Sequence, residues 1–133
     1  MPLEEETVEL WLDCVRRDLR AAEVDLATVP PLTEDAGFHC QQAVEKALKA
    51  FLVHRRAPFK KSHDIEYLLD LCVEQDDSFD QLRESAAPLT VHATRFRYPL
   101  LGPGPGPERI REDLDVARRV MQFVLDRLPD QER

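Results

Sequence analysis

Two polar residues, Gln41 and Glu45, stand in a segment of sequence that is otherwise largely apolar. At about 100° per residue in a helix, Gln41 falls inside the apolar face and Glu45 falls one turn later on its border. A buried amide or carboxylate costs about 1–3 kcal/mol unless it is hydrogen-bonded. The cations that could pair with Glu45 are Lys49, one turn further on, and His63 or Arg97 from other segments. Two interpretations stay open: a polar clamp that fixes the bundle register or a dimer interface, and the wall of a ligand pocket.

Basic residues gather around the expected start of the next helix. Positions 55 to 63 hold four cations and an imidazole, namely Arg55, Arg56, Lys60, Lys61 and His63. The unpaired N–H groups and the dipole of a helix N-terminus favour an anion, so this cluster, with Asp64 after it, predicts a phosphate site. The alternative is that the arginines cap the preceding helix, the lysines are solvated and His63 is a first-turn packing residue.

A second basic corner is expected where Arg97, Tyr98 and Pro99 close the fourth helix. Arg97 could meet a carboxylate from the second helix or a phosphate. Tyr98 could stack on a base or pack under the proline-rich loop that comes after it. The corner is therefore either part of a pocket or a structural turn.

Long amphipathic helices must position these groups. Apolar residues at spacings of three and four predict a helix over about 3–27. A second helix is expected over about 34–55, with Thr33 as its N-cap and Pro58 beyond its end. Ser62 is expected to cap a third helix, whose apolar face repeats with the same spacing.

Prolines and glycines divide the second half of the chain. Residues 78–81 match a capping box, and the helix after it is expected to kink or split at Pro88. The Gly/Pro stretch 101–107 cannot be helical, and Pro107 suits the first position of a last helix. Long helices joined by short connections predict an all-α fold, an antiparallel up-down bundle of four to five helices.

Composition bounds the fold and the class of protein. The 133 residues, at 43% hydrophobic and 33% charged with a net charge of −8, suit one folded domain over 1–133 with its core at about 8–128. No apolar run approaches the roughly 18–20 residues of a membrane span, and residues 1–6 reverse the pattern of a signal peptide. Three cysteines without a paired spacing predict buried thiols in a cytoplasmic protein, with neither disulfides nor a metal site.

The segment Phe38–Leu52 resembles the signature helix of the HEPN domain family. Three further features of the sequence resemble that family's pattern: Asp18-Leu19 with Ala22, Lys61–Ile65, and Arg97–Pro99. The resemblance implies a bundle of four to five helices, often homodimeric. It also implies a context beside a small nucleotidyltransferase, in toxin–antitoxin or RNA-cleaving systems.

HEPN ribonucleases carry an arginine, four to six residues and then a histidine near a helix start. No histidine comes after Arg97, because His92 is the last in the chain. Arg56 and His63 have that spacing, with six residues between them, but Pro58 and the expected cap Ser62 interrupt the stretch. The sequence therefore assigns no catalytic residue and no cofactor, and a metal-independent endoribonuclease is the weaker alternative.

The sequence thus favours a binding protein over an enzyme. The predicted ligand or phosphate contacts are Lys60, Lys61, His63, Asp64, Arg97 and Tyr98. The residues expected to orient the site are Gln41, Gln42, Glu45 and Lys49. The expected partners are a second copy, a nucleotidyltransferase, and a nucleotide or RNA; a purely structural partner subunit is the other alternative.

Overall fold

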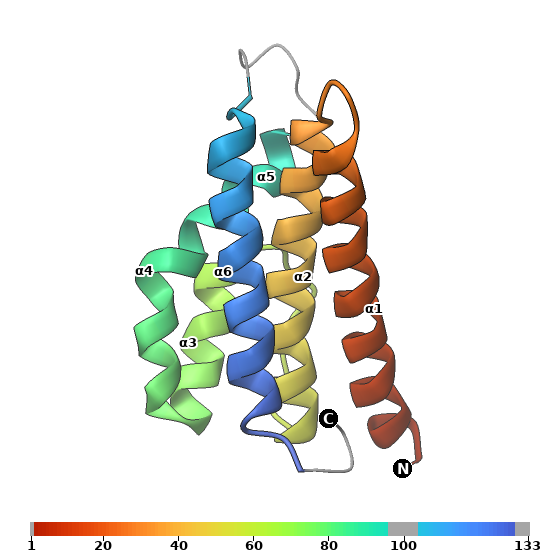
Figure 1. Ribbon diagram of the computed structural model, residues 1–133. Helices are drawn as coiled ribbons and strands as arrows, with labels where there is room; N and C mark the ends of the chain where they lie inside the picture. The colour runs from red at the N-terminus through yellow and green to blue at the C-terminus, as the bar shows by residue number, and fades with distance from the viewer. Residues whose placement is uncertain (1, 96–103, 130–133) are drawn as a thin grey trace.

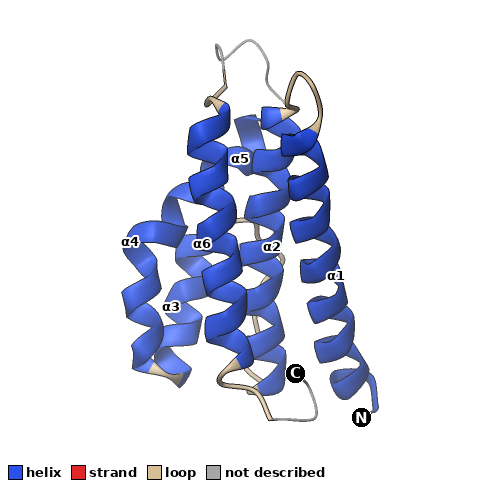
Figure 2. Cartoon of the chain, viewed as in Figure 1, coloured by secondary structure: helices blue, strands red, loops and turns tan. Residues whose placement is uncertain are grey.

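The computed structural model describes residues 2–95 and 104–129, and this part of the chain is a helical bundle without strands (Figures 1 and 2). The first two helices, α1 (Pro2–Ala27) and α2 (Thr33–His54), form an antiparallel pair joined by a short loop. The predicted all-α fold and the first two predicted helices are confirmed.

Helix α2 forms the centre of the bundle. From Cys40 to Leu52 every residue except Lys46 is buried, as expected for a helix covered on all sides. Its neighbours are α1, α3 (Ile65–Gln75) and α6 (Pro107–Leu125). The inward-facing polar residues of α2 are therefore held among three other helices.

Loop 55–64 carries the chain back along α2 before the next helix begins (Figure 1). Gln41 Nε2 donates to the His63 carbonyl oxygen at 3.3 Å, which places the end of the loop beside the first half of α2. Helix α3 then runs in the same direction as α2, since the Cys72 thiol lies 3.8 Å from the Leu48 carbonyl oxygen. The loop thus brings His63 level with the buried polar turn of α2.

The segment after α3 is broken into short pieces. It consists of η1 (Asp77–Leu82), α4 (Arg83–Ala86), η2 (Ala87–Thr90) and α5 (Val91–Arg95). Pro88 lies in the first turn of η2, which confirms the predicted split. Phe79 of η1 anchors the segment in the core, with ring centroids 4.3 Å from Phe51 and 4.9 Å from Phe123.

Helix α6 begins at Pro107 as predicted, after the non-helical residues 104–106. The start of α2 passes close to α5 and α6 at Gly37. A Cβ at Gly37 would lie 2.9 Å from His92 Nδ1, closer than real Cβ contacts, and 3.1 Å from Ile110 Cδ1, tighter than most of them. Glycine therefore lets these three helices approach closely without displacing the His92 ring.

Three predicted helix starts are wrong in detail. Thr33 is the first residue of α2, and its N-cap, Leu32, makes no side-chain cap. Asp64 rather than Ser62 caps α3, because its carboxylate accepts from the Glu66 N–H while the Ser62 hydroxyl accepts from the Asp64 N–H. Asp76 takes the same role at η1, in place of the predicted capping box at 78–81, by accepting from the Ser78 N–H at 3.0 Å.

All three thiols are free of disulfides, and two of them, Cys40 and Cys72, are buried. Burial raises the pKa of each buried thiol to about 12. Cys14 is only partly covered, contrary to the expectation for that residue. Among the described helices, none is long and apolar enough to cross a bilayer.

Candidate functional site

The two polar residues of α2 are buried, as the helical pattern predicted. Gln41 is 0% and Glu45 3% exposed. Gln41 Nε2 donates to Glu45 Oε1 at 2.9 Å, and Gln42 Nε2 donates to Gln41 Oε1 at 2.8 Å. The three side chains form one hydrogen-bonded series that ends on the Glu45 carboxylate.

Lys49 supplies the buried countercharge to Glu45. Its ammonium donates to Glu45 Oε2 at 2.9 Å, and the residue is only 5% exposed. The ammonium also lies 5.5 Å from the ring centroid of Trp11 and 5.9 Å from that of Phe59. Aromatic faces attract a desolvated cation, so one residue of α1 and one of loop 55–64 help to hold this charge in the core. Sequence reasoning missed both aromatic residues.

His63 is the exposed member of the cluster. Its Nδ1 lies 2.8 Å from Glu45 Oε1, and its side chain is 56% exposed. A carboxylate paired with Lys49 is ionised and can only accept, so Nδ1 of His63 carries the hydrogen. The opposite ring nitrogen, Nε2, points away from this bond. We name Gln41, Glu45, Lys49 and His63 the Glu45 cluster.

A shallow pocket of about 260 Å³ opens in the same stretch of chain, around the end of loop 55–64. Its lining residues are Lys60, Lys61, Ser62, Asp64 and Tyr67. The Tyr67 hydroxyl accepts from the Lys60 N–H at 2.8 Å, and the Lys60 ammonium lies 5.8 Å from the Tyr67 ring centroid. Three of the predicted phosphate contacts, Lys60, Lys61 and Asp64, therefore share one pocket.

The two arginines of the predicted basic cluster do not line this pocket, and two predicted contacts lie outside the described residues. Arg55 is the C-cap residue of α2, in keeping with the capping alternative, and its guanidinium lies 5.2 Å from the ring centroid of Phe51, while Arg56 adopts a positive φ of 57°. Arg56 lines a different pocket, with Val53, Ala57 and Pro58. Arg97 and Tyr98 lie outside the described residues.

A second polar group, which sequence reasoning did not single out, lies near the loop that joins α1 and α2. Asp18 of α1 accepts from Lys46 at 2.8 Å, and its other oxygen lies 2.8 Å from His39 Nδ1. His39 Nε2 in turn lies 3.6 Å from Asp35 Oδ2. We name this group, together with Asp25, the Asp25 cluster.

Asp25 is the least satisfied member of that cluster. It is 9% exposed, and its Oδ2 is buried without a hydrogen-bond partner. Burial and the neighbouring Asp35 carboxyl raise the pKa of Asp25 to about 6. A spacing signal was present in the sequence, because Asp18 and Asp25 are seven residues apart and Asp35 and His39 four apart. Both spacings return to nearly the same face of a helix.

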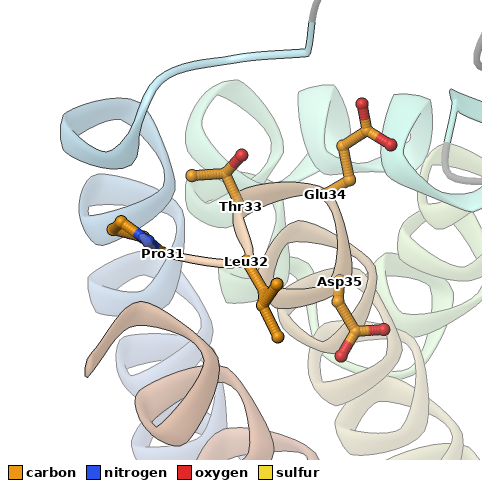
Figure 3. Close-up of a pocket in the computed structure, with 5 residues that line it drawn as sticks. All are labelled: Pro31, Leu32, Thr33, Glu34 and Asp35. Carbon is orange, nitrogen blue, oxygen red and sulfur yellow. The ribbon is translucent and has the colours of Figure 1, made fainter. Parts of the chain in front are cut away.

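A hollow lies at the start of α2, and Asp35 of the Asp25 cluster is one of the residues that line it (Figure 3). The hollow has a volume of about 370 Å³ and is lined by Pro31, Leu32, Thr33, Glu34 and Asp35. The preceding turn is held in place because the Leu32 N–H donates to the Asp25 carbonyl oxygen at 2.9 Å. One carboxylate, Asp35, belongs to both the cluster and the hollow.

With the geometry known, comparison with known proteins identifies the fold family. The model of the HEPN domain matches residues 8–128. The chain belongs to the HEPN domain family. No curated protein matches the chain.

Two solved structures resemble this HEPN domain closely. TT1696 from Thermus thermophilus is 29% identical, covers 91% of this chain and 98% of its own, and has a TM-score of 0.71. ST0689, an archaeal HEPN homologue, is 26% identical, covers 90% of this chain and 96% of its own, and has a TM-score of 0.70. The similarity extends over nearly the whole length of both proteins.

Proposed function

We propose that this HEPN domain is a binding protein that holds the phosphate groups of a nucleotide at the corner formed by Lys60, Lys61 and His63. The observation that carries the proposal is the 2.8 Å contact between His63 Nδ1 and the buried Glu45 carboxylate, which orients the exposed side of the imidazole. In the imidazolium form, Nε2–H on that side donates to a phosphate oxygen. A ring oriented in advance loses little rotamer freedom when a ligand binds. Asp64 stays in the proposed site as the residue that caps α3.

Charge supports a small anion rather than a long nucleic acid. Residues 34–63 hold six basic and three acidic residues, whereas the whole chain has a net charge of −8. An extended RNA would contact the acidic surface as well as the basic corner, and that repulsion weakens binding. A nucleotide can confine its phosphates to the corner. Arg97 and Tyr98 remain predicted contacts of the same ligand.

The arrangement around His63 favours a binding site over a ribonuclease site. Arg56, which would pair with His63 in a ribonuclease, lines a pocket with Val53, Ala57 and Pro58, whereas the residues around His63 line another. A ribonuclease needs an arginine to steady the scissile phosphate beside the histidine that moves the proton. The separation of the two linings therefore favours binding over cleavage.

Family membership adds partners to the proposal. We propose that the chain forms a homodimer in the cytoplasm and pairs with a small nucleotidyltransferase, as one half of a toxin–antitoxin-like system. Light scattering should give about twice the chain mass of 15.3 kDa. A monomeric mass would refute the dimer.

Thermal unfolding with and without ATP or GTP tests the nucleotide site. A ligand that binds only the folded state at about 100 times its Kd adds about 2.7 kcal/mol, which raises Tm by several degrees. The double variant Lys60→Ala/Lys61→Ala should lose the shift, and His63→Ala should reduce it. Arg17→Ala/Arg20→Ala, which removes two exposed cations from α1, is the matched control and should keep the shift.

Three results would overturn the proposal. No shift at millimolar nucleotide would leave a purely structural partner subunit. An equal loss of the shift in the α1 control would mean nonspecific attraction. Cleavage of RNA in EDTA that disappears in His63→Ala would establish the ribonuclease instead.

A further inference from the structure

Three side chains at the α1–α2 turn direct metal-ligating atoms toward one another. They are Asp25 near the end of α1, and Asp35 and His39 in the first turns of α2. One ligand atom from each lies within 4.8 Å of the other two. Two carboxylate oxygens and one imidazole nitrogen are a donor set suited to first-row divalent metals.

The cluster has more negative charge than its own cations neutralise. Lys46 is bound to Asp18, so it is committed to that carboxylate. Asp25 Oδ2 is buried with no N–H or O–H donor in reach, and the carboxyl faces that of Asp35, to which it can bond only through a shared proton. A buried carboxylate oxygen without a partner is costly, and a cation between the two acids would remove that cost.

The imidazole of His39 is already oriented as a ligand. Asp18 pairs with the Lys46 ammonium through one oxygen, and as a carboxylate it accepts from His39 Nδ1 through the other. In the neutral ring the lone pair is then on Nε2, the nitrogen 3.6 Å from Asp35 Oδ2. A carboxylate that holds the far nitrogen of a histidine is the usual outer support of a metal-bound imidazole.

We propose that Asp25, Asp35 and His39 bind a divalent transition-metal ion, with Zn²⁺ the best match, and that Asp18 is the positioning residue for His39. Three protein ligands with nitrogen and oxygen donors leave a fourth position for water or an added ligand. The hollow of about 370 Å³ that Asp35 borders is the side from which such a ligand would enter.

Binding requires only a small local adjustment. Ligands at about 2.0–2.2 Å from zinc in a tetrahedral site lie roughly 3.3–3.6 Å apart, closer than the present spread. The Asp35 side chain is 39% exposed and has room to turn. The α1–α2 turn is already held, since the Leu32 N–H donates to the Asp25 carbonyl oxygen at 2.9 Å.

Calorimetry and thermal unfolding on the metal-free full chain, with Zn²⁺ as the only added ligand, test the proposal. We expect one saturable site per chain and a rise in Tm, with Mg²⁺ giving neither because it prefers oxygen ligands in an octahedral arrangement. Asp25→Asn, Asp35→Asn and His39→Gln should each weaken Zn²⁺ binding at least about tenfold, and Asp18→Asn about tenfold.

Matched controls separate this site from other zinc ligands in the chain. Binding should be unchanged in His63→Gln, which alters the other histidine–carboxylate pair, in Asp13→Asn, an exposed acid of α1, and in Cys14→Ser. Asp35 is partly exposed, so Asp35→Asn tests the site even if the variant at buried Asp25 folds poorly. Absence of a Zn²⁺ site, or undiminished binding in both Asp35→Asn and His39→Gln, would overturn the proposal.

Discussion

The Glu45 cluster and the Asp25 cluster both place a carboxylate between a histidine and a lysine, but they differ in net charge. In each, a histidine Nδ1 lies 2.8 Å from an aspartate or glutamate that also binds a lysine. Glu45 has the ammonium of Lys49, an amide and an imidazole around it, so its oxygens are satisfied. The Asp25 cluster adds two further carboxylates without adding a cation.

This difference indicates what each cluster can do. A satisfied, buried network fixes geometry, and the side chain that it orients, His63, is the one that can meet a ligand. A cluster with more carboxylates than cations, such as the Asp25 cluster, attracts a positive ion. The two proposals thus assign an anion site to the cluster whose charges are balanced and a cation site to the cluster with an excess of acids.

The largest loss of stability should come from removing Glu45, the acid at the centre of the Glu45 cluster. Glu45→Ala leaves the buried ammonium of Lys49 without its carboxylate, which costs about 3–5 kcal/mol. Urea unfolding monitored by circular dichroism measures the loss. The aromatic rings near Lys49 return only part of it.

A double-variant cycle tests the same explanation. Glu45→Ala combined with Lys49→Met removes both buried charges, so the pair of substitutions should destabilise less than the sum of the two single ones. Additive losses, or a loss below about 1 kcal/mol for Glu45→Ala, would contradict a charge-balanced core.

A smaller loss is expected at the corresponding acid of the other cluster. Asp18→Asn weakens the bonds to Lys46 and His39, and hydrogen bonds to charged groups contribute about 1.5–3 kcal/mol. Urea unfolding of metal-free protein should show a loss of about 2 kcal/mol. Asp13→Asn, which breaks only an exposed pair with Arg16, is the matched control and should change stability by less than about 1 kcal/mol.

The smallest change in the free energy of unfolding is expected for a substitution of Asp25, and this change should be stabilising rather than destabilising. Asp25→Asn in EDTA at neutral pH removes a negative charge that faces Asp35 and keeps the volume of the side chain. The free energy of unfolding should stay level or rise by up to about 1 kcal/mol. A clear destabilisation of the metal-free protein would mean that Asp25 has a stabilising partner, and the contrast between the clusters would disappear.

Helical periodicity was enough to predict most of the fold and three of the four members of the Glu45 cluster. The positions of Gln41 and Glu45 follow from about 100° per residue, and the bond to Lys49 follows from a spacing of four. These are contacts within one helix, where local geometry determines which side chains meet. The split at Pro88 could be predicted for the same reason.

Contacts between segments could not be predicted in this way. Nothing in local spacing shows that loop 55–64 runs back along α2, or that Trp11 and Phe59 meet at Lys49. The Asp25 cluster combines spacings on two helices, and its convergence depends on the turn that joins them. The helix caps were misassigned because a serine and an aspartate stand two residues apart at both starts, and spacing alone does not show which side chain caps the helix.

The path of loop 55–64 makes its length a requirement for the site. One residue added to or removed from an extended segment shifts the residues after it by up to about 3.3–3.6 Å, whereas successive turns of α2 are about 5.4 Å apart. A single insertion before His63 would therefore leave the imidazole between two turns of α2, opposite neither Glu45 nor its neighbour one turn away. A HEPN chain could retain every polar residue of both clusters and still lose the arrangement through a change in the number of residues.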